Sequence, residues 1–134
     1  MKGLLRQLIQ ADSTPEMGEL EAARATEAYF KKHGVPCDID RWDDRRANVI
    51  AHVKSGGSRP ALLFVCHLDV VSAGREPWSY PPFEARETGG KVYGRGAVDM
   101  KGGIAAAAAA ICQTVAAGTQ LQGDIIFAAT AGEE

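Results

Sequence analysis

Apolar residues in the first part of the chain recur at the spacing of an α-helix. This pattern predicts a first helix over residues 4–11 and a second helix over residues 15–33. The second helix has a capping hydroxyl at Thr14, a proline at its first position and Gly34 after its last residue, which favours these ends. The apolar positions are Leu4, Leu5, Leu8 and Ile9 in the first helix, and Met17, Leu20, Ala23 and Phe30 in the second.

The middle and last parts of the chain contain segments with strand-like patterns. Residues 35–40 and residues 48–54 predict two strands, the second with alternating apolar residues that indicate one buried face. Residues 61–66 are apolar without interruption, which is typical of a strand covered on both faces, so they are predicted to form the central strand. An alanine-rich helix over residues 101–117 and an apolar strand over residues 124–130 follow. Strand, crossover helix and strand in this order predict a parallel or mixed sheet.

The segment between the predicted central strand and the alanine-rich helix is predicted to be a loop. It is rich in proline and aromatic residues, and it ends in the apolar pair Val92-Tyr93 and a turn at residues 94–96. Neither an internal repeat nor a linker divides the chain, so a single domain is expected.

Composition and charge exclude several classes of protein. The hydrophobic fraction is 46%, but alanine supplies much of it, so the helices are expected to pack closely through small side chains. A formal net charge of -2 gives no basic surface for nucleic acid. The three cysteines form no C-x-x-C pair, which fits a reducing cytoplasm better than a disulfide framework or a Cys-based zinc site. No segment resembles a secretory signal or a membrane span, so a cytoplasmic protein without a membrane anchor is expected.

The first candidate functional residues come directly after the predicted central strand. His67 and Asp69 form a His-x-Asp motif there, and ligands of open α/β sheets gather at the carboxyl ends of strands. The imidazole of His67 could bind a metal, and the Asp69 carboxylate on the same side could hold the other ring nitrogen. A histidine that is merely hydrogen-bonded at a strand end is the alternative for this motif alone.

A glycine-rich turn carries the next candidate, Asp99. Residues 94–103 have the sequence GRGAVDMKGG and open the alanine-rich helix. The glycines permit a tight turn, and Asp99 lies at the start of the helix, where a carboxylate is stabilised; a capping aspartate is the alternative. A dinucleotide-binding fingerprint is disfavoured, because Asp99 occupies the place of its third glycine and Thr119 stands where an acidic residue would hold a ribose.

Two adjacent carboxylates, Glu133 and Glu134, follow the last predicted strand. A cation relieves their mutual repulsion, and a site with both can use one as a metal ligand and the other as a base. A solvated pair is the alternative for these residues alone. All three motifs, however, lie at the ends of elements that one edge of a sheet can bring together.

Together these motifs resemble the zinc-dependent amidohydrolase and metallopeptidase family that includes acetylornithine deacetylase, succinyl-diaminopimelate desuccinylase, aminoacylase and glutamate carboxypeptidase. The resemblance extends over nearly the whole chain and is carried, in order, by residues 13–15, 48–51, 67–71, 78–83, 94–103 and 132–134. Ser72 departs from the family, which commonly has proline there. The resemblance implies an incomplete zinc-exopeptidase-like catalytic domain with a three-layer α/β/α fold and a mixed, mostly parallel sheet. It also implies a cis peptide bond at Asp99-Met100.

The resemblance also implies a role for each motif residue. His67 matches a ligand of one zinc ion, Glu134 a ligand of a second zinc ion, and Asp99 the carboxylate that bridges the two; Co²⁺ is a possible substitute. Asp69 matches the residue that orients His67. Glu133 matches the general base, which takes a proton from a bridging water and returns it to the departing amine.

Three ligand residues are too few for two zinc ions, since a catalytic zinc usually takes about three protein ligands. The family supplies a further carboxylate and a further histidine later in the sequence, around a smaller lid and dimerisation domain. Residues 1–134 are therefore expected to be the N-terminal part of the catalytic domain of a full-length homodimer. Alone, they are expected to be inactive and to bind metal weakly.

The family implies hydrolysis of the amide bond of an N-acyl amino acid, with a small-peptide exopeptidase (a dipeptidase or carboxypeptidase) as the alternative. An inactive truncated form or a non-catalytic binding domain is a second alternative. The presence of all five motif residues argues against the binding domain, because a binding domain has no need for both Glu133 and Glu134. His33 and His52 are predicted to be a helix-end residue and a solvent-facing strand residue, and Cys66 to be buried in the packing.

Overall fold

A computed structural model describes the whole chain, residues 1–134. The fold consists of a main sheet, a separate hairpin and helices on one side of the main sheet. In chain order the elements are α1 (Lys2–Gln10), α2 (Leu20–Lys32), β1 (Cys37–Arg41), β2 (Ala47–Val53), β3 (Arg59–His67), β4 (Arg86–Thr88), β5 (Lys91–Tyr93), the irregular turn η1 (Ala97–Lys101), α3 (Gly102–Ala116) and β6 (Gly123–Thr130). None of the helices is both long enough and apolar enough to cross a membrane.

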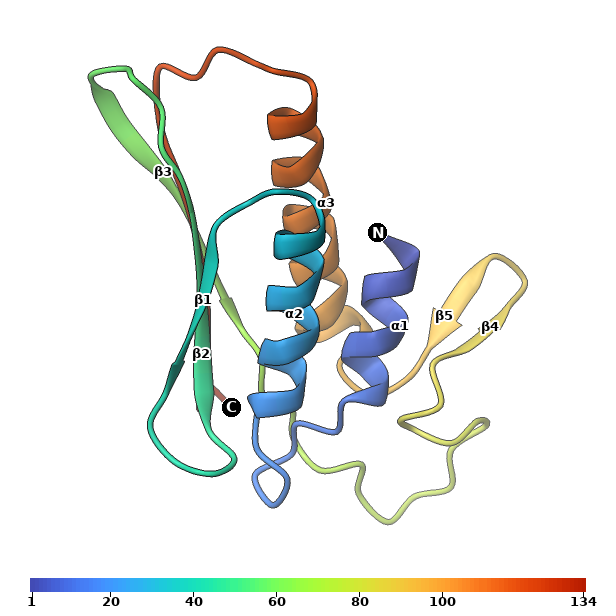
Figure 1. Ribbon diagram of the computed structural model, residues 1–134. Coiled ribbons are helices and arrows are strands. Elements are labelled where there is room, and N and C mark those ends of the chain that lie inside the picture. The colour runs from blue at the N-terminus through green and yellow to red at the C-terminus, as the bar shows by residue number, and fades with distance from the viewer.

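The main sheet has the strand order β1-β2-β6-β3. β3 and β6 run parallel and are joined through α3, as predicted, whereas β1 with β2 and β2 with β6 are antiparallel. α2 and α3 cover one face of this sheet, and α1 packs on these two helices on the same side, as Figure 1 shows. The α/β class and the mixed sheet are thus confirmed. Because β3 and β6 are parallel neighbours, their carboxyl ends meet at one edge of the sheet.

The structure departs from three finer expectations about the sheet. It has two layers instead of three, because α1, α2 and α3 all lie on the same face. The sheet is not mostly parallel, because the chain contains one strand–helix–strand crossover and the other pairings are antiparallel. β3 is an edge strand instead of the central strand, since it pairs with β6 alone. On the bare face of the sheet, Leu63 is 54% and Val65 is 64% exposed, so this apolar run is not covered on both faces.

The hydrophobic core lies between the helices and the covered face of the sheet. Phe127 of β6 and Phe30 of α2 are fully buried, and their rings meet edge to face with centroids 5.1 Å apart. α3 contributes small buried side chains such as Ala105 and Ala108. The expected close packing through alanine is confirmed.

The second helix begins at Leu20 instead of residue 15. Thr14 opens a single turn, in which its backbone oxygen accepts hydrogen bonds from the N–H groups of Met17 (3.0 Å) and Gly18 (2.8 Å). Gly18 has a φ of +76°, and a Cβ atom there would lie 2.5 Å from the backbone oxygen of Arg45. The chain therefore bends at this glycine before the helix starts. Met17 is 58% exposed as a result, whereas the other residues of the predicted apolar side are buried.

A hairpin of β4 and β5 forms within the segment predicted to be a loop. Thr88 pairs with Lys91 across the two-residue turn Gly89-Gly90, and both glycines have positive φ values, 56° and 74°. Two residues with positive φ match the right-handed twist of the flanking strands. The Gly-Gly pair is the sequence signal for this hairpin.

All three cysteines are free and buried, in agreement with their spacing. Burial raises the pKa of the Cys37 thiol to about 12 and also raises the pKa values of Cys66 and Cys112. Because the thiolate is the reactive form, we expect the native protein to react with a disulfide reagent such as DTNB far more slowly than the protein in urea. Labelling of the native protein at the rate of the unfolded protein would contradict this burial.

Candidate metal centre

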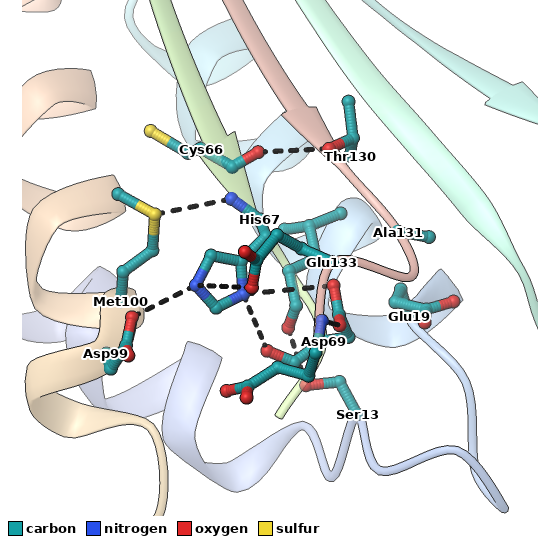
Figure 2. A network of polar contacts seen from close by, with 12 residues as sticks. Ser13, Glu19, Cys66, His67, Asp69, Asp99, Met100, Thr130, Ala131 and Glu133 are labelled. Carbon is teal, nitrogen blue, oxygen red and sulfur yellow. Dashed lines mark hydrogen bonds and ion pairs between the residues drawn. The ribbon is translucent and has the colours of Figure 1, made fainter. Parts of the chain in front are cut away.

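Three segments of the chain meet at the carboxyl edge of the main sheet. β3 ends at His67, and the loop after β6 carries Glu133 and Glu134. The pairing of the two parallel strands continues to His67 and Thr130, so the strands end side by side. The turn η1 brings Asp99 to the same place from the start of α3 (Figure 2).

The side chains of His67, Asp99 and Glu134 can each offer one ligand atom to the same ion. The Nε2 atom of His67 lies 3.0 Å from Oδ1 of Asp99, and the ligand atoms of all three residues lie within 4.8 Å of one another. His67 is buried, whereas Asp99 and Glu134 are exposed, so the cluster is open to solvent on one side. One imidazole nitrogen with carboxylate oxygens is a ligand set that zinc takes in proteins. The residues present therefore fit a divalent cation.

Glu133 lies beside this cluster. Its Oε2 atom is 4.0 Å from Nε2 of His67, and its side chain is 66% exposed. The carboxylate thus borders the space in front of the His67 ring and remains accessible to solvent. Such a position suits proton transfer to or from a molecule held at the cluster.

The buried carboxylate of Asp69 holds the loop that carries the two glutamates. Its Oδ2 atom accepts a hydrogen bond from the backbone N–H of Glu134 at 2.8 Å. Burial alone would raise the pKa of this carboxyl, but hydrogen bonds from the backbone of Glu134 and Glu133 outweigh burial and hold the pKa below its usual range. The Nδ1 atom of His67 is 3.1 Å from the backbone oxygen of Asp69 and 3.8 Å from its Oδ1. In this structure the His67 ring is therefore oriented by the peptide oxygen of Asp69 more than by the carboxylate.

The electrostatics of the cluster favour positive charge. Burial alone would lower the pKa of the His67 imidazole, but the hydrogen bond with Asp99 and the nearby oxygens of Asp69 raise this pKa overall. The carboxylates that stabilise an imidazolium would also stabilise a bound cation. The electrostatics of the cluster and the types of its ligand atoms therefore both favour a bound cation.

The turn that carries Asp99 contains a cis peptide bond between Asp99 and Met100. This bond confirms the expectation from the family resemblance. The sulfur of Met100 accepts a hydrogen bond from the backbone N–H of His67 at 3.3 Å. The turn is thus in direct contact with the end of β3 (Figure 2).

Buried polar residues around the cluster were not predicted from the sequence. The Oγ atom of Ser13 donates to the backbone oxygen of Leu68 at 2.7 Å, and the buried Glu19 accepts from Arg46 at 3.1 Å. Lys101 is fully buried and donates to a backbone oxygen at the end of α1; burial lowers its pKa to about 8. These partners lie 55, 27 and 90 positions apart in the sequence. Neither helical nor strand periodicity points to such distant pairs.

The other two histidines lie away from the cluster. His33 is exposed at the end of α2, with its Nδ1 atom 2.7 Å from the backbone oxygen of Tyr29. His52 lies on the bare face of the sheet, with its Nε2 atom 2.7 Å from Oδ2 of Asp124. Both positions agree with the sequence prediction, and Cys66 is buried as expected.

Sequence comparison relates the chain to known hydrolases. Residues 63–134 match the model of peptidase family M20/M25/M40. A probable succinyl-diaminopimelate desuccinylase of Staphylococcus aureus is 37% identical over 122 residues, which are 90% of this chain and 30% of the relative. The succinyl-diaminopimelate desuccinylase of Wolbachia pipientis wMel is 38% identical over 133 residues, which are 98% of this chain and 32% of the relative. The chain thus spans less than a third of the length of these curated relatives.

Solved structures share the fold. An M20 family metallo-carboxypeptidase, Sso-CP2 from Sulfolobus solfataricus, has a TM-score of 0.78 and 23% identity, covering 94% of this chain and 29% of that chain. Human carnosine dipeptidase 1 has a TM-score of 0.74 and 24% identity, covering 96% of this chain and 31% of that chain. The family model matches more than half of the chain and agrees with the resemblance expected from the motifs. The chain belongs to peptidase family M20/M25/M40.

Proposed function

We propose that this chain contributes metal ligands and the general base to an enzyme that hydrolyses the amide bond of an N-acyl amino acid. The observation that carries the proposal is the convergence of His67, Asp99 and Glu134 within 4.8 Å at the sheet edge, with Glu133 beside them. Membership of a peptidase family supports the reaction class. Two relatives named as desuccinylases support an N-acyl amino acid as the substrate.

The proposed ligands serve two zinc ions. His67 would hold one ion and Glu134 the other, with Asp99 shared, because its carboxylate has two oxygens and lies in one cluster with both residues. Co²⁺ accepts the same nitrogen and oxygen ligands and is the expected substitute. Such ions would polarise the scissile carbonyl and lower the pKa of a water molecule.

Glu133 is the proposed general base. Its carboxylate borders the space in front of His67 and is not needed as a ligand. It takes a proton from the attacking water and later gives this proton to the departing amine nitrogen, so that it ends the cycle as it began. Asp69 keeps the base in place, because its carboxylate accepts hydrogen bonds from the backbone of the loop that carries Glu133 and Glu134.

The remaining ligands are proposed to lie outside residues 1–134. Even with Asp99 shared, His67 and Glu134 leave each ion with fewer than the usual three or so protein ligands. The chain covers 30% of the length of the S. aureus relative, and the rest of such a protein could supply the missing ligands and a lid domain that pairs two subunits. Residues 1–134 would then be the N-terminal part of the catalytic domain.

The direct test is metal-dependent release of amine from N-succinyl and N-acetyl amino acids by the full-length protein, followed with ninhydrin. We expect turnover with Zn²⁺ or Co²⁺, its loss after dialysis against EDTA, and its return when metal is restored. Residues 1–134 alone should give no turnover. A full-length protein that hydrolyses neither acyl amino acids nor small peptides would overturn the proposal and would favour a binding domain.

A further inference from the structure

The backbone that follows His67 is held by a buried serine from the start of the chain. Ser13 is fully buried, and its Oγ atom donates to the backbone oxygen of Leu68 at 2.7 Å. The backbone N–H of Val70 donates to the backbone oxygen of Ser13 at 3.1 Å. Leu68 and Val70 flank Asp69, so Ser13 fixes the short segment that joins His67 to Asp69.

The turn that carries Asp99 is held by a buried lysine. The Nζ atom of Lys101 donates to the backbone oxygen of Ala11 at 2.9 Å. The backbone N–H of Lys101 donates to the oxygen of Gly96 at 2.8 Å, and its aliphatic stem lies so close to Gly96 that a Cβ atom there would be 3.2 Å from Cδ. Lys101 thus ties both ends of the Asp99 turn to the end of α1.

Ala11 and Ser13, which make these two contacts, lie two positions apart in a hydrogen-bonded segment. Ala11 ends α1 through a hydrogen bond from its N–H to the oxygen of Gln7 at 2.9 Å. Oδ1 of Asp12 accepts hydrogen bonds from the N–H (3.0 Å) and the hydroxyl (2.8 Å) of Thr14. The ammonium group of Lys101 therefore lies at the negative end of the α1 dipole, near the Asp12 carboxylate. A positive charge is stabilised at such a position.

We infer that residues 11–14 form a positioning bridge that sets the placement of His67 relative to Asp99, with Ser13 and Lys101 as its two contacts. The inference rests on the proposed metal function, because its consequence is the geometry of the metal ligands. A role in packing alone does not account for Lys101. A buried ammonium costs free energy of desolvation, whereas a methionine of similar length would fill the same volume without it.

The test compares the Co²⁺ affinity of the full-length protein with that of its Ser13→Ala and Lys101→Met variants, measured by the visible absorption of bound cobalt. Loss of a residue that supports metal ligands typically weakens metal binding by roughly 10- to 100-fold, and we expect losses of this size for both variants. The double variant should lose less than the product of the two single effects, because both contacts act through the same segment. The shape of the cobalt spectrum should also change, since it reports the arrangement of the ligands.

Thr26→Val is the matched control. Thr26 is fully buried and its hydroxyl donates to the backbone oxygen of Ala22 at 2.9 Å within α2, so the variant loses a buried hydroxyl without touching the bridge. It should lose stability but keep the cobalt affinity and spectrum. Ser13→Ala or Lys101→Met with the affinity and spectrum of this control would refute the bridge. If Lys101→Met does not fold, Ser13→Ala alone decides, and a wild-type full-length protein without saturable cobalt binding would refute the proposed metal site itself.

Discussion

Replacing Phe127 with alanine should lower the free energy of unfolding by about 3–5 kcal/mol, the usual loss for a buried aromatic ring. Phe127 is fully buried in β6, which has a neighbouring strand on each side, and its ring packs edge to face on Phe30 of α2. The substitution leaves a cavity between the sheet and the helix. Urea unfolding followed by far-UV circular dichroism measures the loss.

Leu63→Ala is the matched control for this prediction. Leu63 lies on the bare face of the same sheet and is 54% exposed, so its replacement should cost less than about 1 kcal/mol. If Phe127→Ala is already unfolded without urea, its circular dichroism spectrum will show this directly, in agreement with a large loss. Equal losses for the two variants would contradict a core confined to one face of the sheet.

Glu133→Gln in the full-length protein should reduce turnover by about 10²–10⁴-fold, the range attributed to general acid–base catalysis. Glutamine has nearly the size of glutamate, but its amide does not accept a proton at neutral pH. The metal should stay bound, because Glu133 is not among the residues whose ligand atoms cluster within 4.8 Å. Steady-state kcat and the metal content of the purified variant measure the two effects separately.

Glu134→Gln, one residue later, provides the comparison. We expect this variant to lose bound metal and, with it, activity, because Glu134 belongs to the ligand cluster. Full turnover by Glu133→Gln would rule out its role as the base. Loss of metal from Glu133→Gln to the same extent as from Glu134→Gln would make Glu133 a ligand instead.

The elements of the fold could be predicted where the signal is local. Patterns of apolar residues predict α1, α3 and the strands of the main sheet, because burial leaves a local pattern in the sequence. The place of β3 at the sheet edge could not be predicted this way, since an apolar run does not specify which strands pair with it. The start of α2 was missed because the bend at Gly18 packs closely against Arg45, and Leu20 donates a hydrogen bond to the backbone oxygen of Arg45, which is distant in the sequence.

The candidate site shows the same difference between features with a local sequence signal and features that depend on distant residues. His67, Asp99 and Glu134 could be singled out as candidate ligands because each follows or opens a predicted element at one edge of the sheet, and the structure brings the three side chains together. Ser13 and Lys101 were missed as supports of the site, because their partners lie 55 and 90 positions away. A buried lysine has no sequence signal of its own, because lysine is normally exposed.

The most direct test of the proposed metal centre is a Co²⁺ titration of the full-length protein, followed by visible absorption. The proposal predicts saturable binding by the wild-type protein, loss of bound cobalt in His67→Ala, and unchanged binding in His52→Ala. His52 is the matched histidine, because it pairs with Asp124 on the bare face of the sheet, away from the cluster. The same binding curve for His67→Ala and the wild type, or no saturable binding by the wild type, would contradict a metal centre formed by His67, Asp99 and Glu134.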